Sequence, residues 1–189
     1  MNVKNTNNNF EQYKRIVKFS GSAVIVLLEL AAYYYVWMNY YNKNMTVAFW
    51  RRGNWLIEGE YLALSLVLHR LYGGLKVGIY KYWALVYSHM ISIIGVNAFS
   101  YVQVVLFDKK MHNPTALFVL TIVDFVMVLV WALVFKKLYA SMFPKRKLLL
   151  IYGKKPMFHL VNRIDTRDDK YEIAENMSID MGLERIIKL

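Results

Sequence analysis

One uncharged run constrains the fold of this chain more than any other feature. Residues 82–107 are 26 consecutive positions without an Asp, Glu, Lys or Arg. At about 1.5 Å per helical residue, a run of this length crosses the roughly 30 Å hydrocarbon core of a bilayer. We therefore expect a membrane protein, although the mean hydropathy of the whole 189-residue chain is only +0.26.

Three other stretches are apolar and long enough to span a bilayer: residues 19–38, 55–72 and 116–135. The stretch over 55–72 is the least apolar, because Glu58, Glu60 and Arg70 lie near its ends. Taken alone, it could equally be an interfacial or re-entrant helix. The sequence therefore predicts an all-α membrane fold with three clear spans and a fourth that needs a second argument.

The distribution of basic residues supplies that argument. With four spans, 14 Lys and Arg lie on the side of the N-terminus and 5 on the opposite side. Because cytoplasmic loops carry the excess of Lys and Arg, this imbalance predicts four spans with both termini in the cytoplasm. Three spans would place the two most basic flanks on opposite faces. In this layout residues 1–18 form a cytoplasmic tail and residues 19–139 the transmembrane domain.

Composition excludes several other classes of protein. The net charge is +11, but the basic residues cluster beside apolar runs instead of forming one stripe, so we expect no nucleic-acid partner. The absence of cysteine excludes a disulfide scaffold, a cysteine-ligated zinc site and thiol chemistry. The lipid bilayer is the partner that the composition predicts, and self-association of the helices stays open.

Residues 140–189 have a different character. Three basic residues, Lys145, Arg146 and Lys147, follow the last span and are expected at anionic headgroups. The segments over 148–152 and 171–179 suggest strands, and those over 157–164 and 183–189 suggest helices. This order is typical of the start of a Rossmann-like α/β domain, which is incomplete because two strands cannot bury both faces of a parallel sheet.

Three polar residues interrupt the predicted spans: Glu29, His89 and Asp124. Burying such groups in lipid is costly, so we expect them to face the interior of the bundle. On the same helical face as His89 lie Ser92, Ser100 and Gln103. A proton or ion path is one interpretation, and structural hydrogen bonding between helices is the one that we favour.

No recognisable catalytic or cofactor motif accompanies the predicted strands. The segment after the first strand, Gly153-Lys154-Lys155, lacks the second glycine of a dinucleotide fingerprint. Lys154 and Lys155 could attract a phosphate, but a solvated loop is the simpler interpretation. We therefore predict no catalytic, cofactor-binding or metal-ligating residue in this chain.

Several segments in order are familiar: FWRRGNWLIEGEY, RLYGGLKVGIYKYW, SHMISIIGVNAFSYVQVVLF, YASMFPKRKLLLIYGKKP and NRIDTRDDKYEIAENMSIDMGLERI. Together they resemble the N-terminal half of bacterial polyprenyl glycosylphosphotransferases, the sugar transferases that initiate exopolysaccharide and capsule synthesis. The resemblance runs from about Phe10 to Leu189 and depends on the whole ordered set, because no single segment is specific.

The resemblance implies four membrane helices, a Rossmann-like domain and then a catalytic domain, in the bacterial inner membrane. It also implies transfer of a sugar 1-phosphate from a nucleotide sugar to undecaprenyl phosphate with Mg²⁺, by an Asp-Glu pair in the catalytic domain. The sequence ends before that domain, so we expect this chain alone to be inactive. The alternatives are the N-terminal part of a membrane nucleotide-sugar dehydratase or epimerase, and a non-catalytic membrane scaffold.

Overall fold

The computed structural model describes residues 13–78, 80–143, 146–152, 161 and 171–178. The chain divides into two compact units, Met1–Tyr139 and Ala140–Leu189. The first unit holds the helices, and the second unit holds a pair of strands.

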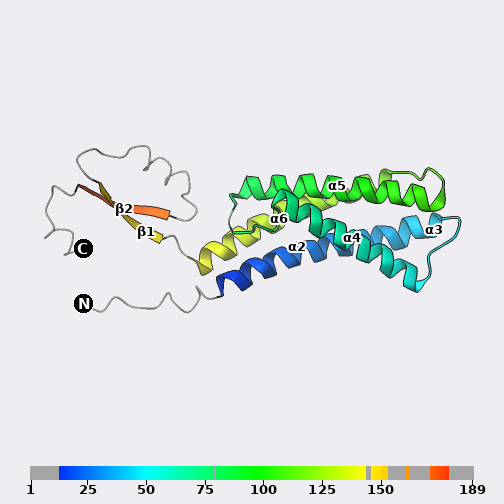
Figure 1. Cartoon of the computed structure of the whole chain (residues 1–189), viewed down its shortest axis with the longest axis horizontal. Helices are drawn as coiled ribbons and strands as arrows, with labels where there is room; N and C mark the ends of the chain where they lie inside the picture. Colours follow the sequence, from blue (N-terminus) through cyan, green and yellow to red (C-terminus); the bar gives the residue numbers. More distant parts are fainter. Residues whose placement is uncertain (1–12, 79, 144–145, 153–160, 162–170, 179–189) are drawn as a thin grey trace. The chain divides into compact units, whose positions relative to one another are not determined.

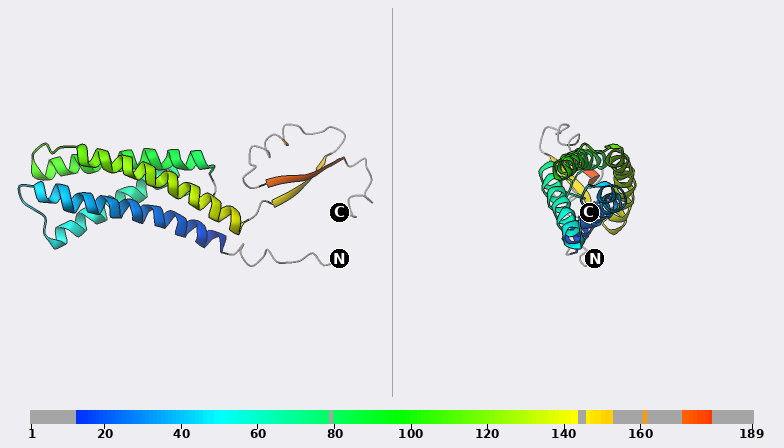
Figure 2. Two further views of the ribbon diagram at one scale, coloured as in Figure 1. Left: turned by 180° about the vertical axis from the view of Figure 1, so that it is seen from behind. Right: turned by 90° about the vertical axis from the view of Figure 1, so that its right-hand side faces the viewer.

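Four long helices make up the first unit: α2 (Lys14–Val36), α4 (Arg51–Tyr72), α5 (Tyr82–Asp108) and α6 (Thr115–Met142). A π-helical turn, η1 (Trp37–Tyr41), and the short α3 (Asn42–Asn44) continue α2. The four long helices run along the bundle, with α4 crossing obliquely (Figure 1, Figure 2). Helix α4 packs against both α5 and α2.

The outer surface of the bundle is apolar, and its interior holds polar side chains among the apolar ones. On α6, large apolar side chains such as Phe118 and Val126 are exposed, whereas Asp124 on the same helix is fully buried. An outer surface this apolar, wrapped around polar groups, is what a lipid environment requires. Among the described residues, three helical segments are long and apolar enough to cross a membrane: Lys14–Asn44, Tyr82–Asp108 and Thr115–Met142. These features are those of a membrane protein.

The three clear spans predicted from the sequence each lie inside one of these segments. Helix α2 begins at Lys14, so residues 14–18 of the segment expected as a tail are helical. Lys and Arg are good helix formers, and their aliphatic stems cover apolar surface while the charged ends reach water. The helix can therefore extend past the last apolar residue.

Helix α4 covers the predicted span over 55–72 but begins earlier, at Arg51. It is not among the three segments that are apolar enough to cross a membrane, because its sequence carries several charged residues. Its end is sharply defined. Gly73 has a φ of +85°, the left-handed conformation that glycine adopts readily at the C-terminal cap of a helix. Whether α4 crosses the bilayer stays a prediction.

The second unit contains two parallel strands, β1 (Arg146–Tyr152) and β2 (Tyr171–Ser178). Arg146 pairs with Tyr171 at one end and Tyr152 with Ser178 at the other, with an irregularity between Leu148 and Leu149. Strand β1 begins two residues before the predicted segment 148–152, and β2 covers the predicted segment 171–179 except residue 179, which lies outside the described residues. The helices predicted over 157–164 and 183–189 lie outside the described residues, except Val161, which is helical.

Candidate functional site

Three buried side chains from three helices converge inside the bundle. Glu29 comes from α2, His69 from α4 and His89 from α5, and their exposed fractions are 1%, 0% and 0%. His69 Nε2 lies 2.8 Å from His89 Nδ1. The two carboxylate oxygens of Glu29 divide between the rings: Oε2 lies 3.4 Å from His69 Nε2, and Oε1 lies 3.4 Å from His89 Nδ1.

The outer nitrogen of each imidazole is already engaged by a backbone carbonyl. His69 Nδ1 lies 2.8 Å from the carbonyl oxygen of Ser65, and His89 Nε2 lies 3.0 Å from that of Gly74. A carbonyl oxygen can only accept a hydrogen bond, so each outer nitrogen carries the proton. In neutral rings, the two inner nitrogens therefore direct lone pairs toward one another and toward Glu29.

The turn after α4 shapes this site. A Cβ atom on Gly74 would lie 2.8 Å from His69 Cδ2 and 3.4 Å from His89 Nε2, so only glycine lets the backbone approach the two rings this closely. The next carbonyl, that of Leu75, accepts a hydrogen bond of 3.0 Å from Ser22 on α2. The turn is thus tied to α2 and α5 by side chains that satisfy its carbonyl groups.

A second cluster of polar side chains lies near the middle of α4 and α5. Tyr61 donates a hydrogen bond of 3.1 Å to Asn97 Oδ1, and the Asn97 amide donates one of 2.9 Å to Thr121. These contacts join α4, α5 and α6. Asp124 on α6 is fully buried, and neither of its carboxylate oxygens has a hydrogen-bond partner.

The polar residues singled out from the sequence do not all meet at one site. Glu29, His89 and Asp124 all face the interior, and the first two share one site. Ser92 and Ser100 bond to carbonyls of their own helix, and Gln103 donates a hydrogen bond to Glu60 on α4. This pattern agrees with interhelical and intrahelical hydrogen bonding.

Sequence reasoning missed His69, which occupies the centre of the site. His69 belongs to the least apolar span, where a polar residue is not conspicuous. The adjacent Gly73-Gly74 pair was a usable signal, because paired glycines after a helix allow close backbone approach. Of the three basic residues expected at headgroups, Lys145 lies outside the described residues, while Arg146 and Lys147 begin β1.

The donor atoms define which ions the site could hold. Within the described part of the chain, Glu29, His69 and His89 form the group of His and acidic side chains whose ligand atoms lie within 4.8 Å of one another. Two imidazole nitrogens and a carboxylate suit zinc and its neighbours. They do not fit Mg²⁺, which prefers oxygen ligands. The Mg²⁺ that the resemblance implies is therefore not assigned here.

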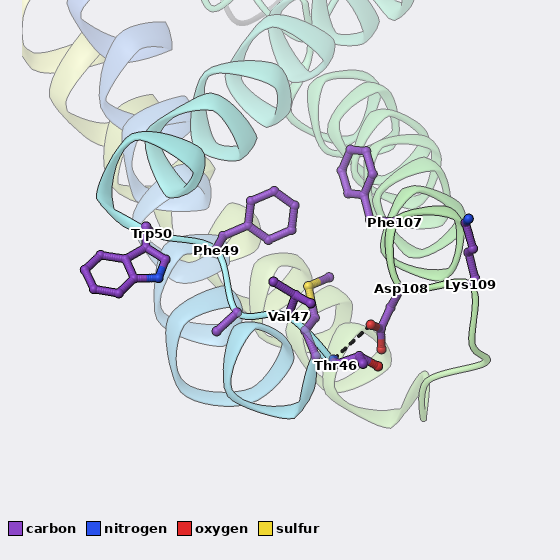
Figure 3. A pocket seen from close by; sticks show the side chains of 9 residues that line it. Thr46, Val47, Phe49, Trp50, Phe107, Asp108 and Lys109 are labelled. Carbon is purple, nitrogen blue, oxygen red and sulfur yellow. Dashed lines mark hydrogen bonds between the residues drawn. The ribbon is translucent and has the colours of Figure 1, made fainter.

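A cleft lies at the opposite end of α5 (Figure 3). It measures about 460 Å³ and lies between the segment 45–50 and residues 107–109. Asp108 accepts a 2.9 Å hydrogen bond from the backbone amide of Thr46, which holds its two walls together. The ring centroids of Phe49 and Phe107 are 5.7 Å apart, and Trp50 is strongly exposed. Aromatic residues at a helix end are typical of a membrane interface.

Comparison with known proteins gives no assignment for this site or this fold. No protein-family model, no curated protein and no solved structure matches the chain.

Proposed function

We propose that this chain is the N-terminal membrane region of a bacterial polyprenyl glycosylphosphotransferase, an enzyme of exopolysaccharide or capsule synthesis. One observation carries the proposal: the parallel pair of β1 and β2 follows the last long helix within a few residues. Parallel strands need a crossover connection of a dozen residues or more, and residues 153–170 provide that length. A helical membrane unit followed directly by a parallel α/β segment is the order that the resemblance implies.

The contacts of α4 support a fourth membrane span. Glu58 is buried, and Glu60 accepts a hydrogen bond from Gln103 of α5. His69 is enclosed by α2 and α5. The buried polar side chains of α4, Glu58 and His69, therefore lie inside the bundle, and the exposed Glu60 is paired with a side chain of α5, so the cost of these groups in lipid is reduced. With four spans, the excess of basic residues favours both termini in the cytoplasm of a bacterial inner membrane.

The role that we assign to residues 1–189 is anchoring and positioning. The resemblance places the catalytic Asp-Glu pair in a domain beyond the segments that this chain matches. Undecaprenyl phosphate and a nucleotide sugar would be substrates of that domain. The helical unit would hold the enzyme at the membrane where the lipid substrate lies, and the strands would connect to the catalytic part.

A domain exchange tests this proposal. In a characterised polyprenyl glycosylphosphotransferase, the membrane and Rossmann-like region is replaced by residues 1–189, and lipid-linked sugar is measured in isolated membranes. We expect product from the chimera and none from residues 1–189 alone. A matched control carries an unrelated four-helix membrane domain in the same place.

Two results would contradict the proposal. One is a chimera that inserts at normal levels and is no more active than the control with the unrelated membrane domain. The other is formation of lipid-linked sugar by residues 1–189 alone, because this result would place the chemistry within the helical unit or its short α/β segment.

A further inference from the structure

We propose that Glu29, His69 and His89 bind one divalent transition-metal ion, best represented by Zn²⁺, which clamps α2, α4 and α5 together. This inference does not depend on sugar transfer. It concerns the assembly of the helical unit, and it would hold for any function of the chain.

The orientation of the two imidazoles favours a bound cation. Both outer nitrogens donate to backbone carbonyls, of Ser65 and of Gly74, so both inner nitrogens are left with lone pairs. These lone pairs approach to 2.8 Å. Two lone pairs at this distance repel unless a cation lies between them. The cation can be a proton shared by the rings or a metal ion bound by both.

Backbone carbonyls hold both imidazoles from outside the site. Histidine ligands in metal sites generally donate their second N–H to a backbone carbonyl or a carboxylate, which fixes the tautomer and the ring orientation. Both His69 and His89 do so here, with well-formed hydrogen bonds of 2.8 and 3.0 Å. The close approach of Gly74 to the two rings is needed for this arrangement. Groups that are not metal ligands therefore hold both imidazoles in an orientation suited to a metal ion.

The number and spacing of the donor atoms also suit a metal ion. Each residue offers one ligand atom, so the site holds two imidazole nitrogens and one carboxylate oxygen, all within 4.8 Å of one another. With Zn–N bonds of about 2.0–2.1 Å, tetrahedral ligand atoms lie about 3.3–3.4 Å apart. Both Glu29–histidine separations are 3.4 Å, and the 2.8 Å separation of the nitrogens would need to widen by about 0.5 Å.

The charge of the buried side chains also favours a divalent ion. Three acidic side chains are buried in the described part of the bundle, Glu29, Glu58 and Asp124, and no Lys or Arg is among the buried residues there. Glu29 Oε1 has no hydrogen-bond partner, and neither oxygen of Asp124 has one. A single proton on the histidine pair balances one carboxylate. A divalent ion balances the charges of two carboxylates, in a region where an uncompensated charge is energetically unfavourable.

The test measures metal binding by the full chain in detergent micelles after removal of any affinity tag. The protein is stripped with a chelator, loaded with Zn²⁺, washed and analysed for zinc by mass spectrometry. We expect about one zinc per chain. The chain has no cysteine, so thiolates contribute nothing to the result.

Three single variants, Glu29→Gln, His69→Gln and His89→Gln, should each weaken zinc binding at least about tenfold, since even the loss of a supporting group costs 10- to 100-fold. The matched control is His112→Gln. His112 is also buried but pairs with Asp108 at 2.7 Å in a separate place, so this variant should retain its zinc. Zinc should raise the melting temperature of the wild type and of His112→Gln, and should leave that of the three ligand variants unchanged.

Loading the wild type with Co²⁺ provides a readout that needs no variant. Intense visible absorption bands of low-symmetry Co²⁺ are expected and would support the site even if a ligand variant failed to fold. A wild-type protein that retains no zinc and gives a featureless Co²⁺ spectrum would overturn the proposal, and the cluster would then be an internal ion pair. Equal loss of zinc in His112→Gln and in the ligand variants would also overturn it.

Discussion

Replacing Gly74 by alanine should destabilise the helical unit through a single collision. The new Cβ would lie 2.8 Å from His69 Cδ2, whereas carbon atoms in ordinary contact lie about 3.5–4.0 Å apart. Both rings are fully buried and hydrogen-bonded, so they cannot turn into solvent. The backbone of Gly74 is not in the left-handed region, so the effect is steric and not conformational.

The expected size follows from two contributions. Overpacking of a well-packed interior costs about 1–3 kcal/mol. Displacing His69 or His89 also weakens a buried hydrogen bond, which adds about 1 kcal/mol. We therefore expect Gly74→Ala to lower the free energy of unfolding by about 2–4 kcal/mol.

Gly59→Ala is the matched control. Gly59 lies within α4, and a Cβ there would have no heavy atom within 4 Å. Alanine in a helix interior is favoured over glycine by about 0.5–1 kcal/mol, so this variant should be slightly more stable than the wild type. The two substitutions are chemically identical and should have opposite signs.

The measurement is reversible unfolding of metal-free protein in mixed micelles of increasing SDS content, followed by tryptophan fluorescence. Trp131, one of the five tryptophans of the chain, lies beside the site, with its ring centroid 5.5 Å from that of His89. Equal stability of Gly74→Ala and wild type would refute the reasoning, because it would mean that the turn does not pack against the rings.

Two further predictions use the same unfolding assay. Asn97→Ala removes the hydrogen-bond partner of both Tyr61 and Thr121 and should lower the free energy of unfolding by about 1–2 kcal/mol. Thr121→Val removes one of the two bonds and should lower it by only part of this amount. An unchanged stability of Asn97→Ala would show that these bonds do not join the helices. Asp124→Asn removes a buried carboxyl group whose oxygens have no hydrogen-bond partner, so the free energy of unfolding of the metal-free protein should stay the same or rise. A decrease of more than about 1 kcal/mol would contradict this account.

The helices of the bundle were largely predictable, since bilayer thickness and hydropathy act on local sequence. An uncharged run such as 82–107 has few ways to fold other than as a long helix in lipid. The exact ends were less predictable. Helix α2 can begin at Lys14 because long basic side chains are compatible with a helix and reach the water at the membrane interface.

The polar cluster was only half predictable. Glu29 and His89 interrupt apolar runs and are conspicuous for that reason. His69 is equally central, but it lies in a helix that already carries charges, and its meeting with a residue 40 positions earlier is a consequence of helix packing. The contact of Gly74 with both rings likewise depends on the three-dimensional course of the turn.

Cysteine labelling tests the four-span arrangement most directly. The chain has no native cysteine, so Val47→Cys, before α4, and Lys76→Cys, after α4, each introduce the only thiol. Both positions are exposed, Val47 with 78% of its surface. In spheroplasts treated with a membrane-impermeant maleimide, Val47→Cys should be labelled, and Lys76→Cys should be labelled only after the membrane is permeabilised. Equal labelling of the two thiols, or equal protection of both, would show that α4 does not cross the bilayer.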